Sequence, residues 1–264
     1  ALATVLGQAL SLVMVLYYPF RTRIRTIRLT AASLHPSGPL LRAICSLGVS
    51  PFLNQMAMFL VQITLNNTLT YYGALSHYGE DIPLACVGVI SKVNILMLGF
   101  TLGISQGCQP IFSYNYGARQ YSRVREAYRK AIVAASVICC IAFVCFQLFP
   151  RPIVALFDPS GSEEYFQFAE RYFRIYMFMT LANAFQPITA NFFTSIGKAA
   201  KGIFISLTRQ IIFLLPLIII LPLIFGIEGV MYSAPVADLM AAALAALFVV
   251  RELSQMKQLQ QAEG

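Results

Sequence analysis

Charged residues are scarce in this chain. Asp, Glu, Lys and Arg make up 11% of its 264 residues, against roughly 25% in an ordinary soluble domain. Hydrophobic residues make up 58%, and the mean hydropathy is +0.70. This composition excludes an ordinary soluble domain and indicates a membrane protein.

Residues typical of catalytic centres are also few. The two histidines, His35 and His77, lie far apart in predicted loops. The chain has no His-x-x-x-His, no Gly-x-Ser-x-Gly and no phosphate-binding loop. Glu163 and Glu164 are adjacent in what we predict to be an exposed, solvated turn. We therefore expect no enzyme, no catalytic residue and no cofactor.

The cysteines show neither metal-site nor disulfide spacing. No two of them form a Cys-x-x-Cys pair, and most lie inside apolar runs, which favours buried reduced thiols. The six are Cys45, Cys86, Cys108, Cys139, Cys140 and Cys145. We expect neither a metal site nor a disulfide framework.

Seven apolar segments reach the length of about 20 residues that a helix needs to cross a bilayer. They are residues 1–20, 50–72, 82–108, 131–149, 172–196, 202–225 and 229–250. The first segment is followed by arginines, the wrong polarity for a signal peptide, so we interpret it as a helix of a longer protein. The pattern predicts an all-α polytopic membrane protein with a six-helix transmembrane bundle and one preceding transmembrane helix.

The intervals between these segments suggest the domain boundaries. Residues 21–47 are polar and contain a turn-rich stretch, which predicts a cytoplasmic interdomain linker with a short amphipathic piece at 40–47. We assign residues 48–253 to the six-helix bundle and residues 254–264 to a cytoplasmic tail that is a frayed helix end.

The basic residues predict the topology. The net charge is +8, but the cations fall in short clusters between apolar runs rather than on one solvated face, so we expect no nucleic-acid partner. Fourteen of the nineteen Lys and Arg residues lie on the side where the first segment ends. By the positive-inside rule that side is cytoplasmic, as is the C-terminus, and the protein is a multi-pass protein of the cell membrane.

Three charged residues lie inside the predicted hydrocarbon region, where each costs about 2.5–3.5 kcal/mol on insertion scales. At 1.5 Å per residue, Lys92 and Asp238 lie about 15 Å and 12 Å from the outer ends of their helices. We hypothesise an ion pair or a shared water-filled site between them, with either a structural or a transport role. Arg209 lies about 10 Å from the cytoplasmic end, which favours a side chain that extends towards the headgroups.

Two predicted helices carry stripes of polar residues on one face. The first stripe is Gln55, Gln62 and Asn66, and the second is Thr180, Asn183, Pro187, Asn191 and Thr194. Such residues either join neighbouring helices by hydrogen bonds or line a polar cavity. In the second case, Pro187 would open its helix and expose backbone carbonyls to a substrate or cation.

A polar segment ends the third predicted helix. Residues 103–118 contain Gln106, Gln109, Pro110 and Asn115, and a cluster of arginines follows. Pro110 is expected to end the regular hydrogen bonding, and Asn115 with Gly117 to turn the chain beneath the membrane. We expect this segment to act as a hinge and gate or as a substrate contact.

Several of these motifs, in this order, resemble the multidrug and toxic compound extrusion (MATE) transporters. Residues 103–106, 109–110 and 113–118 resemble the end of the eighth helix of that family. Residues 1–8 resemble the sixth helix, residues 48–51 the seventh and residues 209–210 the eleventh. Residues 226–230 together with 235–238 resemble the twelfth.

The resemblance implies a twelve-helix exporter made of two bundles around a central cavity, which exchanges outward drug movement for inward Na⁺ or H⁺. This chain would supply helix six and the C-terminal bundle, and the missing N-terminal half would be its partner. It lacks the N-terminal acids of the family, and its segments like helices seven and ten carry amides where some sodium-coupled members have acids. The coupling ion, H⁺ or Na⁺, stays open.

Our function hypothesis is therefore the C-terminal part of a cation-coupled exporter of amphipathic organic cations, embedded in the lipid bilayer. The substrate or ion pathway would include Gln62, Asn66, Lys92, Asn183 and Asp238. The gate would include Gln106, Gln109, Pro110, Asn115 and Arg209. Aromatic faces for the cations would come from Tyr71, Tyr72, Tyr114, Tyr116 and Phe185.

Two alternatives remain at this point. A lipid or polyisoprenoid flippase of the same superfamily would need a cavity lined by several basic residues, and the predicted interior of this half has only Lys92 and Arg209. A non-transporting membrane scaffold subunit would not need the intramembrane charges and the polar stripes.

Overall fold

The computed structural model describes residues 2–21, 37–159 and 161–263 and divides the chain into two units. The first unit, Ala1–Val49, contains helix α1 (Leu2–Arg21) and the beginning of helix α2 (Gly38–Ala74). Residues 22–36, most of the predicted linker, lie outside the described residues. The segment 40–47, predicted to be a separate amphipathic piece, is the first part of the continuous helix α2.

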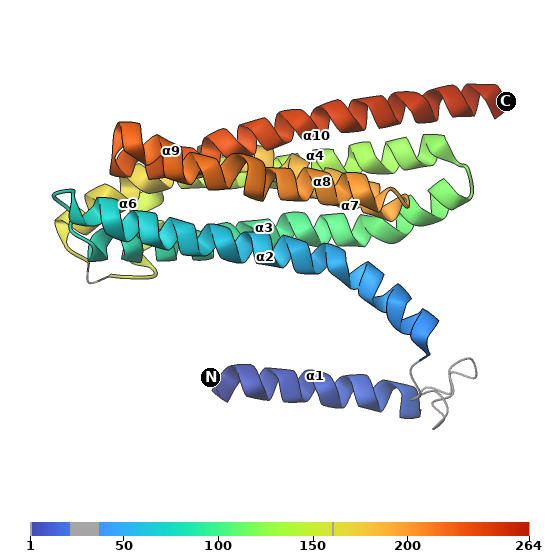
Figure 1. Cartoon of the computed structure of the whole chain (residues 1–264), viewed down its shortest axis with the longest axis horizontal. Helices are drawn as coiled ribbons and strands as arrows, with labels where there is room; N and C mark the ends of the chain where they lie inside the picture. Colours follow the sequence, from blue (N-terminus) through green and yellow to red (C-terminus); the bar gives the residue numbers. More distant parts are fainter. Residues whose placement is uncertain (1, 22–36, 160, 264) are drawn as a thin grey trace. The chain divides into compact units, whose positions relative to one another are not determined.

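The second unit, Ser50–Gly264, is a bundle of helices (Figure 1). After α2 it contains α3 (Asp81–Gly117), α4 (Tyr121–Leu148), α5 (Pro150–Ala155), α6 (Glu163–Tyr176), α7 (Thr180–Ser195), α8 (Ala199–Leu207), α9 (Leu215–Phe225) and α10 (Ile227–Glu263). All seven predicted apolar segments are helical over nearly their whole length, and the described residues form no strand. The all-α bundle expected from the sequence is therefore confirmed.

Helix α7 occupies the centre of the bundle. It packs against α3, α4, α8 and α10. Phe192 of α7 is fully buried and makes ring contacts with Phe112 of α3 at 5.2 Å and with Tyr128 of α4 at 4.8 Å between centroids. These aromatic contacts hold three helices together, because large rings bury much apolar area and add a preferred pair geometry.

Two of the predicted helices are interrupted. The segment 172–196 changes to a 3₁₀ turn at Met177–Met179, which separates α6 from α7. The segment 202–225 contains a π-helical stretch, η3 (Thr208–Leu214), between α8 and α9. Pro216 follows this stretch and has no N–H to offer the carbonyl four residues earlier, which is a physical reason for the wider turn.

The two prolines expected to interrupt helices do not do so. Helix α3 continues through Pro110 and ends at Gly117, and α7 continues through Pro187 to Ser195. The prediction that regular helix ends at Pro110 is wrong, as is the prediction that Pro187 opens its helix. A turn does follow Gly117, with Arg119 at φ 56°, and the Gln120 amide donates to the Asn115 carbonyl at 2.9 Å.

The acidic pair Glu163 and Glu164 is exposed, as predicted, but it lies in a helix rather than in a turn. Glu163 and Glu164 form the first turn of α6, and Ser162 caps it by accepting a hydrogen bond from the Tyr165 amide at 3.2 Å. Acidic residues are favourable in a first turn because they face the positive end of the helix dipole. Glu163 also accepts a hydrogen bond from Arg151 at 2.6 Å, which raises the pKa of that guanidinium.

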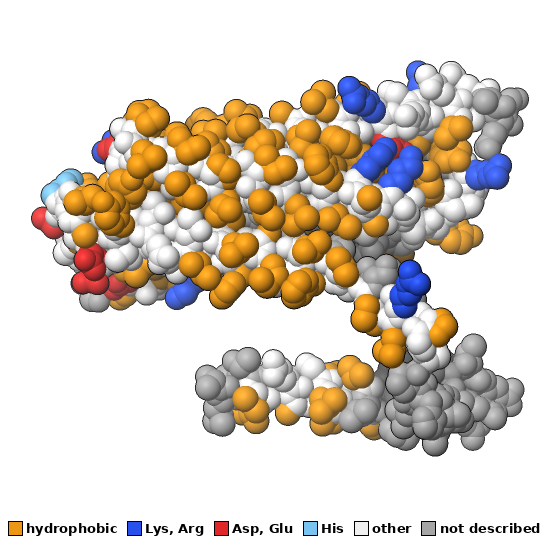
Figure 2. All heavy atoms as spheres, viewed as in Figure 1, with side chains coloured by type: hydrophobic (Ala, Val, Ile, Leu, Met, Phe, Trp, Pro, Cys, Tyr) orange, Lys and Arg blue, Asp and Glu red, His pale blue; other side chains and the backbone are white. Residues whose placement is uncertain are grey.

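The surface of the second unit has the pattern expected of a membrane protein. Figure 2 shows hydrophobic side chains over the middle of the bundle, acidic groups near the end where α6 lies, and Lys and Arg gathered near the opposite end. Four helical stretches of the described chain are long and apolar enough to cross a membrane: Asp81–Gly117, Tyr121–Leu148, Ala199–Phe225 and Ile227–Gln261. The predicted tail from residue 254 continues α10 as helix to Glu263.

Candidate functional site: a polar cavity in the bundle

A cavity of about 600 Å³ lies among α2, α3, α7, α8 and η3. This volume is in the range of small-molecule sites, which run from roughly 300 to 1,000 Å³. Six amide and two hydroxyl side chains line it: Asn54, Gln106, Gln109, Gln186, Asn191, Gln210, Thr194 and Ser206. Apolar side chains complete the wall, among them Met58, Leu98, Leu102, Ile203 and Leu207. The cavity therefore offers polar and apolar surface together.

Hydrogen bonds between helices position several of these polar side chains. The Ser206 hydroxyl donates to the side-chain oxygen Oδ1 of Asn54 at 2.7 Å and joins α8 to α2. The Asn191 amide donates to the Ser105 hydroxyl at 2.9 Å and joins α7 to α3. These contacts hold the wall in place and leave each amide group with further hydrogen-bonding capacity.

Close packing of α7 and α8 forms another part of the wall. Gly202 of α8 has so little space that a Cβ atom would lie 2.5 Å from the Ala190 carbonyl oxygen and 2.6 Å from the Thr194 hydroxyl. Only a glycine fits this approach without a shift of the α7 backbone. The position of α8, and with it Ser206, therefore depends on Gly202.

One charged pair borders the cavity. The Arg209 guanidinium contacts Oδ1 of Asp238 through Nε and Nη2, each at 2.6 Å. The side chains of Arg209 and Asp238 are only 16% and 7% exposed. Because the carboxylate neutralises the guanidinium at close range, the cavity carries no unpaired charge among its lining residues.

The predicted ion pair between Lys92 and Asp238 is wrong. Lys92 is exposed and does not line the cavity, while Asp238 bonds to Arg209. Helix α7 packs against both α3 and α10, so two residues at matching depth on those helices need not meet. The expected extension of Arg209 towards the headgroups is also wrong, because its side chain turns to the carboxylate inside the bundle.

The two polar stripes have different environments. Pro187, Asn191 and Thr194 of the second stripe line the cavity, whereas the side chain of Asn183 lies outside the described part of the structure. In the first stripe Gln62 and Asn66 are exposed and bond to each other at 3.0 Å. They do not line the cavity.

The segment 103–118 contributes two of the predicted gate residues to the cavity, Gln106 and Gln109. Pro110 is exposed within α3. The side-chain amide of Asn115 donates to the backbone carbonyl of Ile111 at 2.8 Å. The five aromatic residues proposed to face organic cations lie elsewhere. None of Tyr71, Tyr72, Tyr114, Tyr116 and Phe185 lines the cavity.

Sequence reasoning missed four polar members of the wall: Asn54, Gln186, Ser206 and Gln210. A weak signal was present in the helical spacing. Gly202, Ser206 and Gln210 recur every four residues and therefore lie on one face of their helix. In an otherwise apolar segment, a small residue followed by a hydroxyl and an amide marks a helix face that packs closely and meets polar groups.

Comparison with known proteins agrees with this architecture, which is that of a helical membrane protein. Residues 55–220 match the MatE family model. This match covers more than half of the chain, and the chain belongs to the MatE family.

Several curated relatives from Staphylococcus carry the name multidrug export protein MepA. The Staphylococcus haemolyticus (strain JCSC1435) protein is 23% identical over 255 residues, which cover 96% of this chain and 53% of the relative. A Staphylococcus aureus (strain bovine RF122 / ET3-1) protein is 22% identical and covers 95% of this chain and 52% of its own length. The chain thus spans about half the length of these relatives.

Solved structures show the same fold. An outward-facing multidrug resistance MATE family transporter of the MOP superfamily superposes with a TM-score of 0.82 at 21% identity, over 97% of this chain and 56% of that one. A MOP superfamily transporter from Pyrococcus furiosus, described as having a binding pocket of reverse polarity, gives the same TM-score at 20% identity and the same coverage. The predicted resemblance of this chain to the C-terminal part of MATE transporters is confirmed.

Proposed function

We propose that this chain forms the C-terminal half of a cation-coupled antiporter that exports amphipathic organic cations, and that the polar cavity is its share of the substrate pathway. The observation that carries the proposal is the lining of the cavity. Amide and hydroxyl groups can accept hydrogen bonds from the N–H groups of a cation, and Met58, Leu98 and Leu102 offer apolar surface to its hydrocarbon part.

The charge state of the cavity favours this substrate class over an anionic lipid. A flippase for a lipid or polyisoprenoid phosphate needs several free cations, and the cavity has one, Arg209, which is already paired with Asp238. A non-transporting scaffold would have no use for a cavity of this size with polar walls.

The coupling ion is proposed to be H⁺ or Na⁺, bound chiefly by acidic residues of the N-terminal half. In this half the buried carboxylate Asp238 is held by Arg209, which disfavours a second cation beside it. Transport would proceed by rocking of the two bundles about the segment 21–42.

The test is efflux of a fluorescent organic cation, such as ethidium, by the full-length protein in proteoliposomes. Replacement of Asn191 or Gln109 by Leu should lower the efflux rate at least tenfold, since each change removes hydrogen-bonding groups from the cavity wall. Gln167→Leu, on the exposed side of α6, is the matched control and should keep the full rate. Equal rates for cavity and control variants would refute the assignment.

The same vesicles identify the coupling ion. A pH gradient and a Na⁺ gradient are imposed separately, and the one that drives ethidium movement names the ion. If neither gradient drives transport while the protein is folded, antiport is refuted. Cross-linking of the two bundles should abolish efflux, and retained efflux would exclude rocking.

A further inference from the structure

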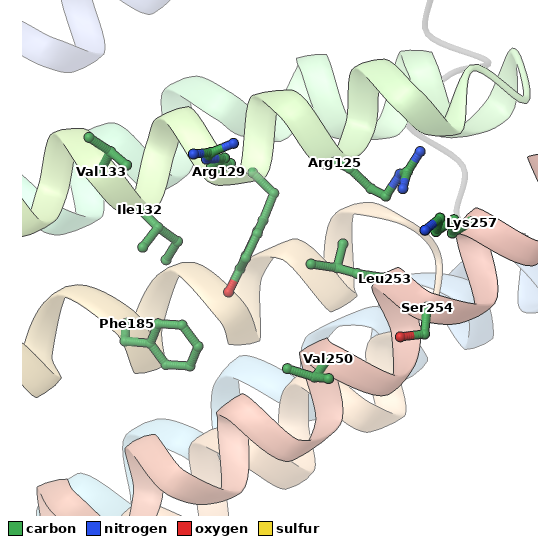
Figure 3. A pocket seen from close by; sticks show the side chains of 10 residues that line it. Arg125, Arg129, Ile132, Val133, Phe185, Val250, Leu253, Ser254 and Lys257 are labelled. Atoms are coloured by element: carbon green, nitrogen blue, oxygen red, sulfur yellow. The ribbon is translucent and has the colours of Figure 1, made fainter.

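A second cavity, of about 500 Å³, forms a groove between α4, α7 and α10 (Figure 3). Its lining is Arg125, Tyr128, Arg129, Ile132, Val133, Phe185, Val250, Leu253, Ser254 and Lys257. It shares no residue with the polar cavity. Within the described residues its wall contains three cations and no carboxylate.

The groove changes character along its length, from basic to apolar. On α4, Arg125 precedes Arg129 by four residues, and Arg129 precedes Ile132 and Val133 by three and four, so all four lie on one helix face. On α10 the order is reversed, with Val250 at the apolar end and Lys257 at the basic end.

The basic ends of the two walls lie at the same end of the groove because α4 and α10 run antiparallel there. A hydrogen bond of 2.7 Å from Arg125 to Gln260 joins the basic ends of α4 and α10. Arg125 and Lys257 extend into the same end of the groove in Figure 3, while Phe185 lies towards the other. From Arg125 to Val133 the groove is about 12 Å long at 1.5 Å per residue.

The cations at the basic end have capacity for an anion. The Nε–H of Arg125 is buried and has no hydrogen-bond partner, and such a donor is costly to leave unsatisfied. Arg129 and Lys257 are exposed and form no ion pair with a described residue. The carboxylates closest in sequence are already neutralised: Glu126 pairs with Lys130, and Glu252 pairs with Lys198 and Lys201 at the start of α8.

The apolar end has a rigid floor and exposed sides. The Tyr128 hydroxyl is buried and bonds to the Thr189 hydroxyl at 2.7 Å, which fixes the ring as floor. Val133 and Val250 are 55% and 62% exposed. In a membrane protein such surface is covered by hydrocarbon, so the apolar end suits an acyl chain.

We propose that this groove binds one anionic phospholipid, with its phosphate on Arg125 and Lys257 and an acyl chain along Val133 and Val250. A free phosphate would use only the basic end, and a neutral lipid only the apolar end. The groove combines both in the head-to-tail order of a phospholipid. The positive-inside assignment of this end of the bundle places the site in the cytoplasmic leaflet, where anionic lipids attract basic groups.

The test measures lipid binding to the full-length protein in detergent by native mass spectrometry, with phosphatidylglycerol and phosphatidylcholine of the same acyl chains. The groove variant carries R125Q and K257Q. The control variant carries R123Q and R251Q, which remove the same charge from exposed positions of the same two helices outside the groove. At about fivefold per cation, the groove variant should bind the tightest phosphatidylglycerol about 25-fold more weakly, and the control less than threefold.

The outcomes separate the sources of the signal. Equal losses in both variants, or equal affinity of the wild type for the two lipids, would overturn the proposal. Inorganic phosphate that binds the wild type as tightly as phosphatidylglycerol does would show an anion site without a lipid and would also overturn it. If the double variant does not fold, K257Q alone, compared with R251Q, serves the same purpose, because Lys257 is exposed and forms no ion pair with a described residue. A fivefold loss for K257Q against none for R251Q supports the site.

Discussion

Removal of one member of the Arg209–Asp238 pair should destabilise the bundle strongly. The change Asp238→Asn keeps the shape of the side chain but leaves the guanidinium without its counterion. Both groups are largely buried, with exposures of 16% and 7%, so solvent can neither screen the pair well nor replace the lost partner. Breaking such a pair typically costs about 3–5 kcal/mol.

The double replacement tests whether the two charges depend on each other for stability. Arg209→Met with Asp238→Leu removes both charges and fills the space with apolar groups, which is often neutral or stabilising. We therefore expect the double variant to be more stable than either single variant. A double variant whose loss equals the sum of the two single losses would refute the buried-pair reasoning, because independent sites add.

The measurement is thermal stability of the full-length protein in detergent, followed as the fraction that stays monodisperse on size-exclusion chromatography after heating. A loss of about 3 kcal/mol should lower the midpoint by about 3 °C, because the unfolding entropy grows with the length of the full protein. Glu163→Gln, which breaks the exposed pair with Arg151, is the control and should leave the midpoint unchanged. An unchanged midpoint for Asp238→Asn would also refute the reasoning.

Three further predictions rest on other contacts. Glu252→Gln should cost about 1–2 kcal/mol in the same assay, because two partly exposed lysines lose a buried counterion. The difference in midpoint from the wild type should narrow at high salt. An unchanged midpoint would show that the two ion pairs do not stabilise the bundle. Gly229→Ala should cost about 1–3 kcal/mol, because its Cβ would lie 2.4 Å from the Leu221 backbone, whereas Gly99→Ala, with no atom within 4 Å, should not; equal losses would refute the close approach. In a cysteine-free background, Asn54→Cys with Ser206→Cys should form a disulfide on mild oxidation, since the native side-chain oxygens are 2.7 Å apart. If no disulfide forms, α2 does not lie beside α8.

Much of the fold follows from composition and helical periodicity. The run 229–250 predicts a membrane-length helix because its backbone must satisfy its own hydrogen bonds in hydrocarbon, and α10 contains it. The clustering of arginines after residue 118 predicts one polar end of the bundle, and Figure 2 shows basic groups gathered near one end. The interruptions were harder to place: Pro110 and Pro187 left their helices continuous, while the break at Met177–Met179 has no proline to announce it.

The contacts between helices were not available from the sequence. Lys92 and Asp238 have matching depth, which is a property of position along a helix, but partnership also depends on rotation about the axis and on which helices are neighbours. Tertiary packing decided both when it placed α7 between α3 and α10 and turned Arg209 to Asp238. It likewise gathered Asn54, Gln109, Asn191 and Ser206 from four helices around one cavity.

The sequence alone therefore determined that this is a helical membrane protein with segregated charge and a MATE-like order of motifs. These features depend on each segment separately, through its hydropathy, its length and its flanking charges. Only the tertiary structure decided which polar groups pair and which line the cavity or the basic groove. Those properties depend on close approaches such as that of Gly202 to α7, and they arise from the packing of several helices at once.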